Sequence, residues 1–179
     1  NCPSNNQKLR WKYGKFIEDK SVEKRKLAPF QSLLFNNTVI KKDCFNIVKF
    51  DSHLTKYGHD DTQLSFQLSQ FNPKLIHIDN PVEHGDIDSN KEYLIKSKSS
   101  LENLLELYNE GKINKDFSRL ISLLLLLNKL KLTYLISVFY KLSEGILKRN
   151  LEGNNPNLFL YTIFRIGYLC KINTLKFKK

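Results

Sequence analysis

The sequence predicts an α/β protein in two parts: a mixed segment of strands and helices over residues 1–87, followed by a helical appendage over residues 88–179. Two observations predict this class. Short runs rich in β-branched and aromatic residues alternate with helical patterns as far as a polar loop at residues 80–90. Beyond that loop, apolar residues recur only at helical spacing. With 179 residues and 41% hydrophobic residues, the chain has enough apolar material for a core.

Local signals define the first elements. Residues 17–27 have the composition of a short helix, which ends before Pro29. Residues 31–42 combine β-branched and aromatic side chains and predict a strand whose two asparagines reach a polar site. Residues 42–51 predict a short helical turn.

A helix and a strand follow. The helix begins within "YGHDDTQLSFQL", residues 57–68, and Asn72-Pro73 ends it. Residues 74–79, "KLIHID", alternate in a period of two and predict a short strand. The Asn, Pro, Gly and Asp residues of 80–90 predict a loop.

The helical appendage is expected to contain one long helix and two or three more. The long helix is amphipathic, lies between Asp88 and Gly111, and has a Gly stop. Further helices are expected over residues 116–131, 133–149 and 156–170.

Positive charge is concentrated in the tail. Residues 1–111 carry 16 Lys and Arg against 15 Asp and Glu, whereas residues 112–179 carry 13 against 3. Such asymmetry indicates a surface that meets anionic lipid or nucleic acid. Solvated lysines on the backs of packed helices would account for it as well. The longest apolar run, residues 123–127, falls far short of the ~20 residues of a spanning helix.

The cysteines and the chain start indicate compartment and context. Cys2, Cys44 and Cys170 have neither disulfide nor zinc-site spacing, so a reducing, cytoplasmic compartment is expected. The sequence opens with Asn1 and contains no Met, so we expect a C-terminal fragment of a longer protein.

Two adjacent carboxylates, Asp60 and Asp61, stand at the predicted helix start. A partly desolvated carboxylate near a hydroxyl can act as a general base, and a second one can orient the substrate. Gly58 would let a ligand approach the backbone closely. The same acids also suit a structural role, because Asp at a helix start caps the helix and complements its dipole. Both interpretations stay open at this point.

The stretches "FNNTVIKKDCF", "FDSHLTKYGHDDTQLSFQL" and "HIDNPVEHG" follow one another in this order. Together they resemble the C-terminal half of a bacterial family 2 glycosyltransferase, which has an N-F-x-I-like strand, a short helix ending in F-D-E, a G-x-E-D motif that opens a helix, and a strand ending near a His. The resemblance covers residues 8–110. It implies that residues 1–87 are the C-terminal part of a GT-A-like catalytic domain, whose N-terminal donor half is missing.

The resemblance implies roles for five residues around the acid pair. Asp61 takes the position of the base that deprotonates the acceptor hydroxyl in inverting enzymes. Asp60 stands where the family usually has Glu and would bind the acceptor, with a side chain shorter by one methylene. Gly58, His59 and Tyr57 would line the acceptor site, with local packing as the alternative for the latter two.

A metal site is also implied. His84 lies where many GT-A enzymes place a His that completes a divalent-metal site. The cation would be Mn²⁺ or Mg²⁺, bound mainly by the missing N-terminal half. Asp86-Ile87-Asp88 is the one Asp-x-Asp candidate, but it follows the acceptor motifs and is therefore in the wrong place for the donor motif.

The predicted function is that of an inverting, metal-dependent glycosyltransferase, hexosyltransferase-like, in surface-polysaccharide synthesis. It would transfer a sugar from a nucleotide-sugar donor to a glycan or lipid-linked acceptor, and this fragment alone would be inactive. We expect it in the cytoplasm at the inner face of the cell membrane, with the basic tail in peripheral contact and no nucleic acid partner. The alternative is a non-catalytic basic helical module that docks on a membrane, nucleic acid or a protein, which the charge of the tail fits equally well.

Overall fold

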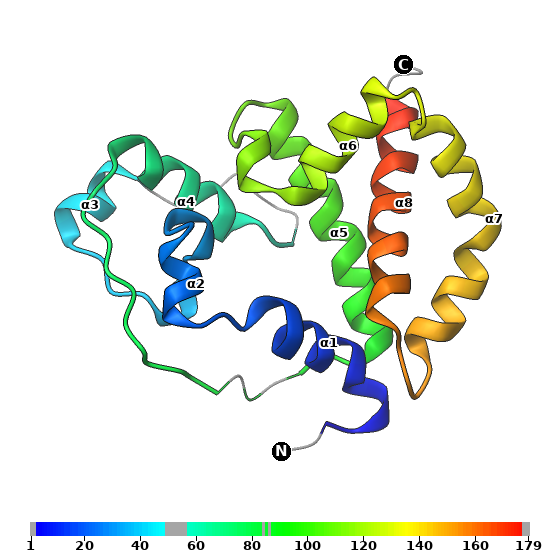
Figure 1. The fold of residues 1–179 in the computed structure, drawn as a ribbon, viewed down its shortest axis with the longest axis horizontal. Coiled ribbons are helices and arrows are strands. Elements are labelled where there is room, and N and C mark those ends of the chain that lie inside the picture. Colours follow the sequence, from blue (N-terminus) through cyan, green and yellow to red (C-terminus); the bar gives the residue numbers. More distant parts are fainter. Residues whose placement is uncertain (1–2, 49–56, 84, 86, 177–179) are drawn as a thin grey trace.

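The structure is a computed structural model that describes residues 3–48, 57–83, 85 and 87–176. Every regular element in these ranges is helical, and no strand occurs among them (Figure 1). The predicted α/β class is therefore wrong for the described part of the chain. The α-helices there are α1 (Lys8–Tyr13), α2 (Val22–Lys26), α3 (Lys42–Ile47), α4 (Asp60–Phe71), α5 (Asn90–Asn109), α6 (Arg119–Lys129), α7 (Thr133–Glu152) and α8 (Leu158–Lys176). A π-helical turn, Gly14–Glu18, follows α1.

The strand predicted over residues 31–42 is wrong. The chain forms two 3₁₀ turns there, Phe30–Ser32 and Phe35–Asn37, and then enters α3. The Thr38 side chain bonds to a backbone carbonyl group that strand pairing would need, because its Oγ1 donates to the carbonyl oxygen of Leu34 at 2.7 Å. Local hydrogen bonds of this kind compete with strand pairing.

The strand predicted over residues 74–79 has no partner among the described residues. Its alternation is real, because Leu75 and His77 are partly buried while Ile76 and Ile78 are exposed. The period of two therefore comes from packing one side of an extended segment against helices, and not from a sheet.

The helices predicted from residue 60 onward are confirmed, with shifted ends. Asn72 adopts a left-handed backbone, φ 46°, immediately after α4 and ends it. Ser89 and Glu92 form a capping box at the start of α5, and Gly111, with φ 70°, follows its end. The three helices of the tail begin and end within a few residues of the predicted positions, except that α8 extends to Lys176.

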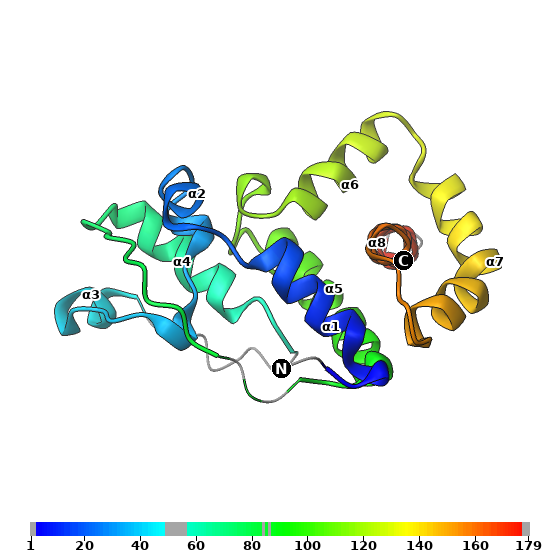
Figure 2. The same cartoon turned by 60° about the horizontal axis from the view of Figure 1, so that its bottom comes forward.

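Helix α8 is the central element of the helical part. Figure 2 shows it end-on, between α5 on one side and α7 on the other, with α6 above. The main core that these helices share consists of Leu9, Leu94, Leu101, Leu104, Leu105, Leu107, Ile113, Ile121, Leu124, Tyr140, Leu147, Leu151, Tyr161, Phe164, Tyr168, Leu169 and Cys170.

Glycine allows α7 and α8 to approach closely. A Cβ atom on Gly167 of α8 would lie 2.6 Å from Cδ2 and 2.8 Å from Cβ of Tyr140, a side chain that is buried in the core. These separations are shorter than van der Waals contact, so no larger residue fits at this crossing without a shift of α7.

A smaller core lies on the N-terminal side, where Val48, Leu64 and Leu68 pack together. Helix α1 belongs to the main core instead, because Leu9 is fully buried there and its backbone N–H donates to Asn90 Oδ1 at 2.8 Å. The domain boundary predicted between residues 87 and 88 stays a prediction.

Replacing Gly167 by Ala is expected to destabilise the fold by about 1 to 3 kcal/mol, because the added methyl group overlaps Tyr140. Gly145 on α7 supplies a matched control, since a Cβ there meets no atom within 4 Å. The Gly145→Ala variant is expected to gain about 0.5 to 1 kcal/mol through the lower entropy of its unfolded chain. Urea denaturation measures both values. If Gly167→Ala were as stable as Gly145→Ala, the close packing of α7 on α8 would be refuted.

Candidate functional site

The residues predicted to bind the acceptor, Tyr57 to Asp60, and the predicted base Asp61 are consecutive at the start of α4, where Gly58 contacts α5. Gly58 has φ 85°, and its carbonyl oxygen accepts a hydrogen bond from Nδ2 of the buried Asn103. A Cβ at this glycine would lie 2.9 Å from Ser100 Oγ. Glycine is therefore needed at position 58 for the close approach of this segment to α5.

His59 follows Gly58 and is uncharged at neutral pH. Its backbone is left-handed, φ 70°, and Nδ1 lies 3.1 Å from Thr62 Oγ1. Burial, together with the positive charge of Arg165, lowers the pKa of His59 to about 4. The imidazole is therefore neutral at physiological pH.

Asp60 and Asp61 occupy the first turn of α4, where Asp60 is partly buried and Asp61 is exposed. Although the Asp61 side chain reaches solvent, the surrounding protein and the charge of Asp60 raise its pKa, against a backbone hydrogen bond from Phe35. A raised pKa suits a general base, and acids in a first turn also suit the helix dipole. The roles of base for Asp61 and acceptor contact for Asp60, His59, Gly58 and Tyr57 stay predictions.

The predicted metal ligand His84 lies outside the described residues. Within residues 3–48, 57–83, 85 and 87–176, no group of three or more His, Cys, Asp or Glu side chains could hold a metal ion. The Mn²⁺ or Mg²⁺ cofactor stays a prediction.

Comparison with known protein families, curated proteins and solved structures finds no match to this chain. The GT-A resemblance also fails on the fold, because a GT-A domain is built on a sheet and the described residues contain no strand. The segments that carry the resemblance form turns, the helix α4 and an unpaired extended segment. The assignment to family 2 glycosyltransferases is therefore wrong.

The guanidinium group of Arg165 lies beside two tyrosine rings where α8 meets α1 and α5. No sequence pattern indicated this cluster. The Arg165 guanidinium lies 5.2 Å from the ring centroid of Tyr13 and 5.5 Å from that of Tyr161. Its Nη1 donates to the Tyr13 hydroxyl at 2.7 Å, and Ser97 Oγ lies 2.5 Å from the Tyr161 hydroxyl. The cluster joins α8 to α1 and α5. Arg165 and Tyr13 are 152 positions apart, so no local pattern could have predicted their contact.

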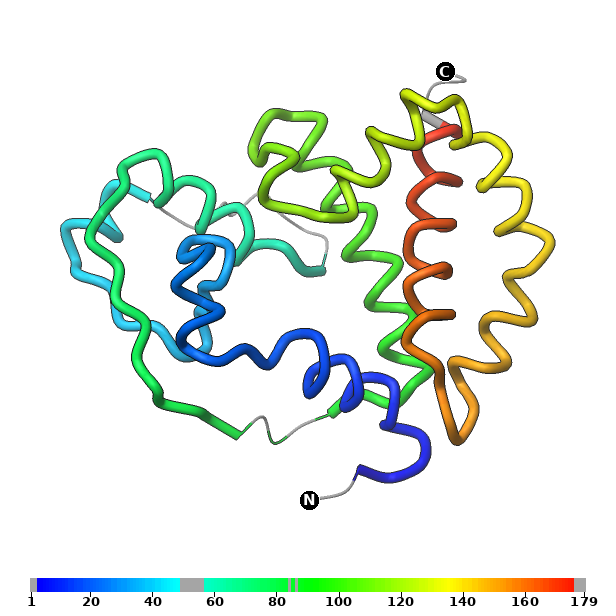
Figure 3. The backbone as a smooth tube through the Cα atoms, in the orientation of Figure 1, coloured from blue at the N-terminus to red at the C-terminus, as the bar shows by residue number. Residues whose placement is uncertain are grey.

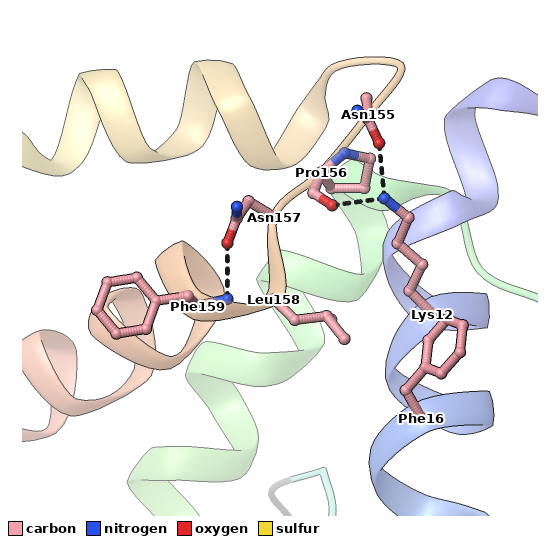
Figure 4. Close-up of a pocket in the computed structure, with 7 residues that line it drawn as sticks. All are labelled: Lys12, Phe16, Asn155, Pro156, Asn157, Leu158 and Phe159. Carbon is pink, nitrogen blue, oxygen red and sulfur yellow. Dashed lines mark hydrogen bonds between the residues drawn. The ribbon is translucent and has the colours of Figure 1, made fainter.

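Lys12 lies in a shallow hollow of about 380 Å³ at the start of α8 (Figure 4). Its ammonium donates to Asn155 Oδ1 at 2.7 Å and to the carbonyl oxygen of Pro156 at 2.9 Å. Asn157 Oδ1 accepts from the backbone N–H groups of Phe159 and Leu160 and so caps α8. The polar groups of the hollow thus tie α1 to the loop before α8.

Helix α7 carries an exposed row of large apolar side chains. Leu135, Phe139, Leu142 and Ile146, here called the outer stripe, follow a 4-3-4 spacing and lie on one side of the helix. Their exposed fractions are 64, 58, 80 and 75%. The opposite side of α7 carries the buried residues Thr133, Ser137, Tyr140, Leu147 and Leu151. Helix α7 is therefore apolar on two sides, and the fold covers one of them.

Charge around the outer stripe is positive. Lys131 precedes α7 and Arg149 lies three residues after Ile146, and both are exposed near the two ends of the stripe. Glu144 is turned to the inner side, where it forms salt bridges with Lys98, Lys148 and Lys171. Burial alone would raise the pKa of Glu144, but Lys98 and Lys148 lower it to about 2.

Helix α6 carries a shorter exposed apolar row, Leu123, Leu126 and Leu130. Among the described residues, no single helix is long and apolar enough to cross a bilayer. Helices α6 and α7 pass that test only as a pair, with a bend of 115° between them.

We expect acid to destabilise the fold through His59. Between pH 6.5 and about 4 the unfolded chain binds a proton at this residue and the folded chain does not, so stability falls as the pH falls. The loss between pH 7 and 4.5 is expected to be about 2 kcal/mol. Denaturant titrations at the two pH values measure it. His59→Gln should remove this part of the pH dependence, and the control His77→Gln should keep it. The same acid sensitivity in both variants would refute the neutral imidazole of His59.

Proposed function

We propose that this chain is a non-catalytic, basic helical module that docks on an anionic membrane surface through the outer stripe of α7. The outer stripe carries the proposal: four large apolar side chains are more than half exposed on a helix whose other side fills the core. A contiguous apolar row of this kind marks an interaction site. The proposed function includes no glycosyltransferase activity.

Charge supports a membrane as the surface that the stripe contacts. Residues 112–179 carry 13 Lys and Arg against 3 Asp and Glu. Glu144, one of those acids, is engaged by three lysines on the inner side of α7, while Lys131 and Arg149 border the outer stripe. Apolar side chains bounded by cations suit an interface of acyl chains beneath anionic headgroups.

The energies are of the size that reversible docking requires. Moving each side chain of the outer stripe from water into acyl chains contributes about 1 to 2 kcal/mol, since each is already partly covered. Each bordering cation adds about 1 kcal/mol at an anionic surface. Helix α7 would lie in the plane of the interface, with α8 above it. The anionic surface is the cytoplasmic leaflet, in keeping with the location expected from the sequence.

The double variant Leu142→Glu with Ile146→Glu is expected to bind vesicles about 100-fold more weakly, because two apolar contacts are lost. Co-sedimentation with phosphatidylcholine vesicles containing phosphatidylserine measures the binding. The control Leu27→Glu with Val39→Glu makes the same charge change at exposed residues outside α7 and should bind as the wild type does. No binding by the wild type, or equal weakening in both variants, would refute docking through the outer stripe.

The charge of the border is tested separately. Lys131→Asn with Arg149→Gln is expected to weaken binding to the anionic vesicles by about 30-fold, since each cation contributes about 1 kcal/mol. Asn is chosen at position 131 because the backbone there is left-handed, φ 58°. Lys24→Gln with Lys26→Gln on α2 removes the same charge elsewhere and should have little effect. Equal effects of the two pairs would show that net charge, and not the border of the stripe, attracts the protein.

A further inference from the structure

The extended segment of residues 74–80 has one side fixed by the protein. Figure 3 shows the chain after α4 as an open, uncoiled trace along the edge of the molecule. Arg25 Nη2 donates to the carbonyl oxygen of Ile78 at 2.9 Å, and Asn37 Nδ2 donates to that of Asn80 at 2.6 Å. The His77 ring adds a contact to the 3₁₀ turn at residues 30–32, with Nε2 at 3.1 Å from the carbonyl oxygen of Pro29. Side chains thus hold this segment in place without a sheet.

The other side of the segment is unpaired. In the described part of the chain, no group accepts a hydrogen bond from the backbone N–H groups of residues 74–80. Ile76 and Ile78 project outward with exposed fractions of 68 and 65%. A run of free main-chain donors beside outward isoleucines is the edge to which an extended chain adds as a β-strand.

Prolines limit this edge. Pro73 and Pro81 stand immediately before and after the seven residues, and neither has a backbone N–H. Pairing is therefore confined to residues 74–80 and cannot spread along the chain. Natural sheets limit exposed edges in this way to prevent open-ended aggregation.

We propose that residues 74–80 pair in antiparallel fashion with the same residues of a second copy of this chain. The second copy supplies what the edge requires, namely an extended segment whose own donors are unpaired. Charge favours the antiparallel direction, because that direction separates the exposed Lys74 side chains of the two copies from each other, and likewise the exposed Asp79 side chains. A parallel pair would place like charges side by side.

Symmetry fixes the register. In an antiparallel pair about a two-fold axis, residues that face each other point to the same side of the sheet, so outward residues meet outward residues. Centring the axis on His77 places Ile76 of each copy opposite Ile78 of the other. Both exposed isoleucines of each chain are then buried together, and β-branched pairs of this kind stabilise strand pairs.

Sedimentation velocity on the full chain tests the proposal. The wild type is expected to shift from 21.0 kDa toward twice that mass as its concentration rises, over about 1 to 200 µM, the range of weak dimers. Ile76→Lys with Ile78→Lys is expected to stay monomeric, with an unchanged far-UV CD spectrum because both side chains are exposed. The matched control, Leu27→Lys with Val39→Lys, should associate as the wild type does.

Amide hydrogen exchange provides a second measurement that needs no variant. The amides of residues 75, 77 and 79, which lie on the edge opposite the bonded carbonyl groups of Ile78 and Asn80, should exchange freely in dilute solution and become protected when the dimer forms. A wild type that stays monomeric throughout, a dimer that survives Ile76→Lys with Ile78→Lys, or a dimer without protection of these amides would each overturn the proposal. None of these results depends on membrane docking, because the outer stripe of α7 is unchanged.

Discussion

The arrangement of the helical part depends on the packing of α8 between α5 and α7. Gly167 brings the backbone of α8 against Tyr140, and that crossing fixes which side of α7 is buried. A helix at the edge of a bundle has one neighbour to cover it, yet α7 is apolar on two sides. Once Tyr140, Leu147 and Leu151 enter the core, the outer stripe has no partner within the described residues. The exposed apolar row is thus a consequence of the packing that stabilises the fold.

The parts of the fold that sequence predicts well are those with local causes. The start of α5 is encoded by Ser89 and Glu92, which lie within one turn of each other, and its end by Gly111. A strand, in contrast, exists only if a second strand pairs with it. Residues 74–79 have the alternation and the extended backbone of a strand, but helices occupy the side where a sheet would lie. The alternation thus predicts which side chains are buried, but the predicted strand is wrong, because no strand occurs in the described part of the chain.

The resemblance around "GHDD" has a structural origin that the contacts make visible. Gly58 is required because α5 passes too close for a side chain, with Asn103 donating to its carbonyl oxygen. His59 adopts a left-handed backbone before the helix, and Asp60 and Asp61 fill a first turn where acids are favoured. The close approach of the segment before α4 to α5 thus requires the glycine, and the first turn of a helix favours the acids that follow it. A motif of four residues cannot distinguish this arrangement from a catalytic helix start, because the two share the same local geometry.

The sequence also predicts the distribution of charged side chains on the folded protein only in part. The excess of cations in residues 112–179 is visible as a count, but the count does not show which lysines are already engaged. Folding places Lys148 and Lys171 on Glu144 together with Lys98 from α5, so these cations stabilise the interior side of α7. Lys131 and Arg149 stay at the ends of the outer stripe.

Figure 1 places α7 at one edge of the molecule and the chain that follows α4 at the other. Pairing of two copies through residues 74–80 therefore leaves both outer stripes uncovered, so each copy keeps its own surface for docking.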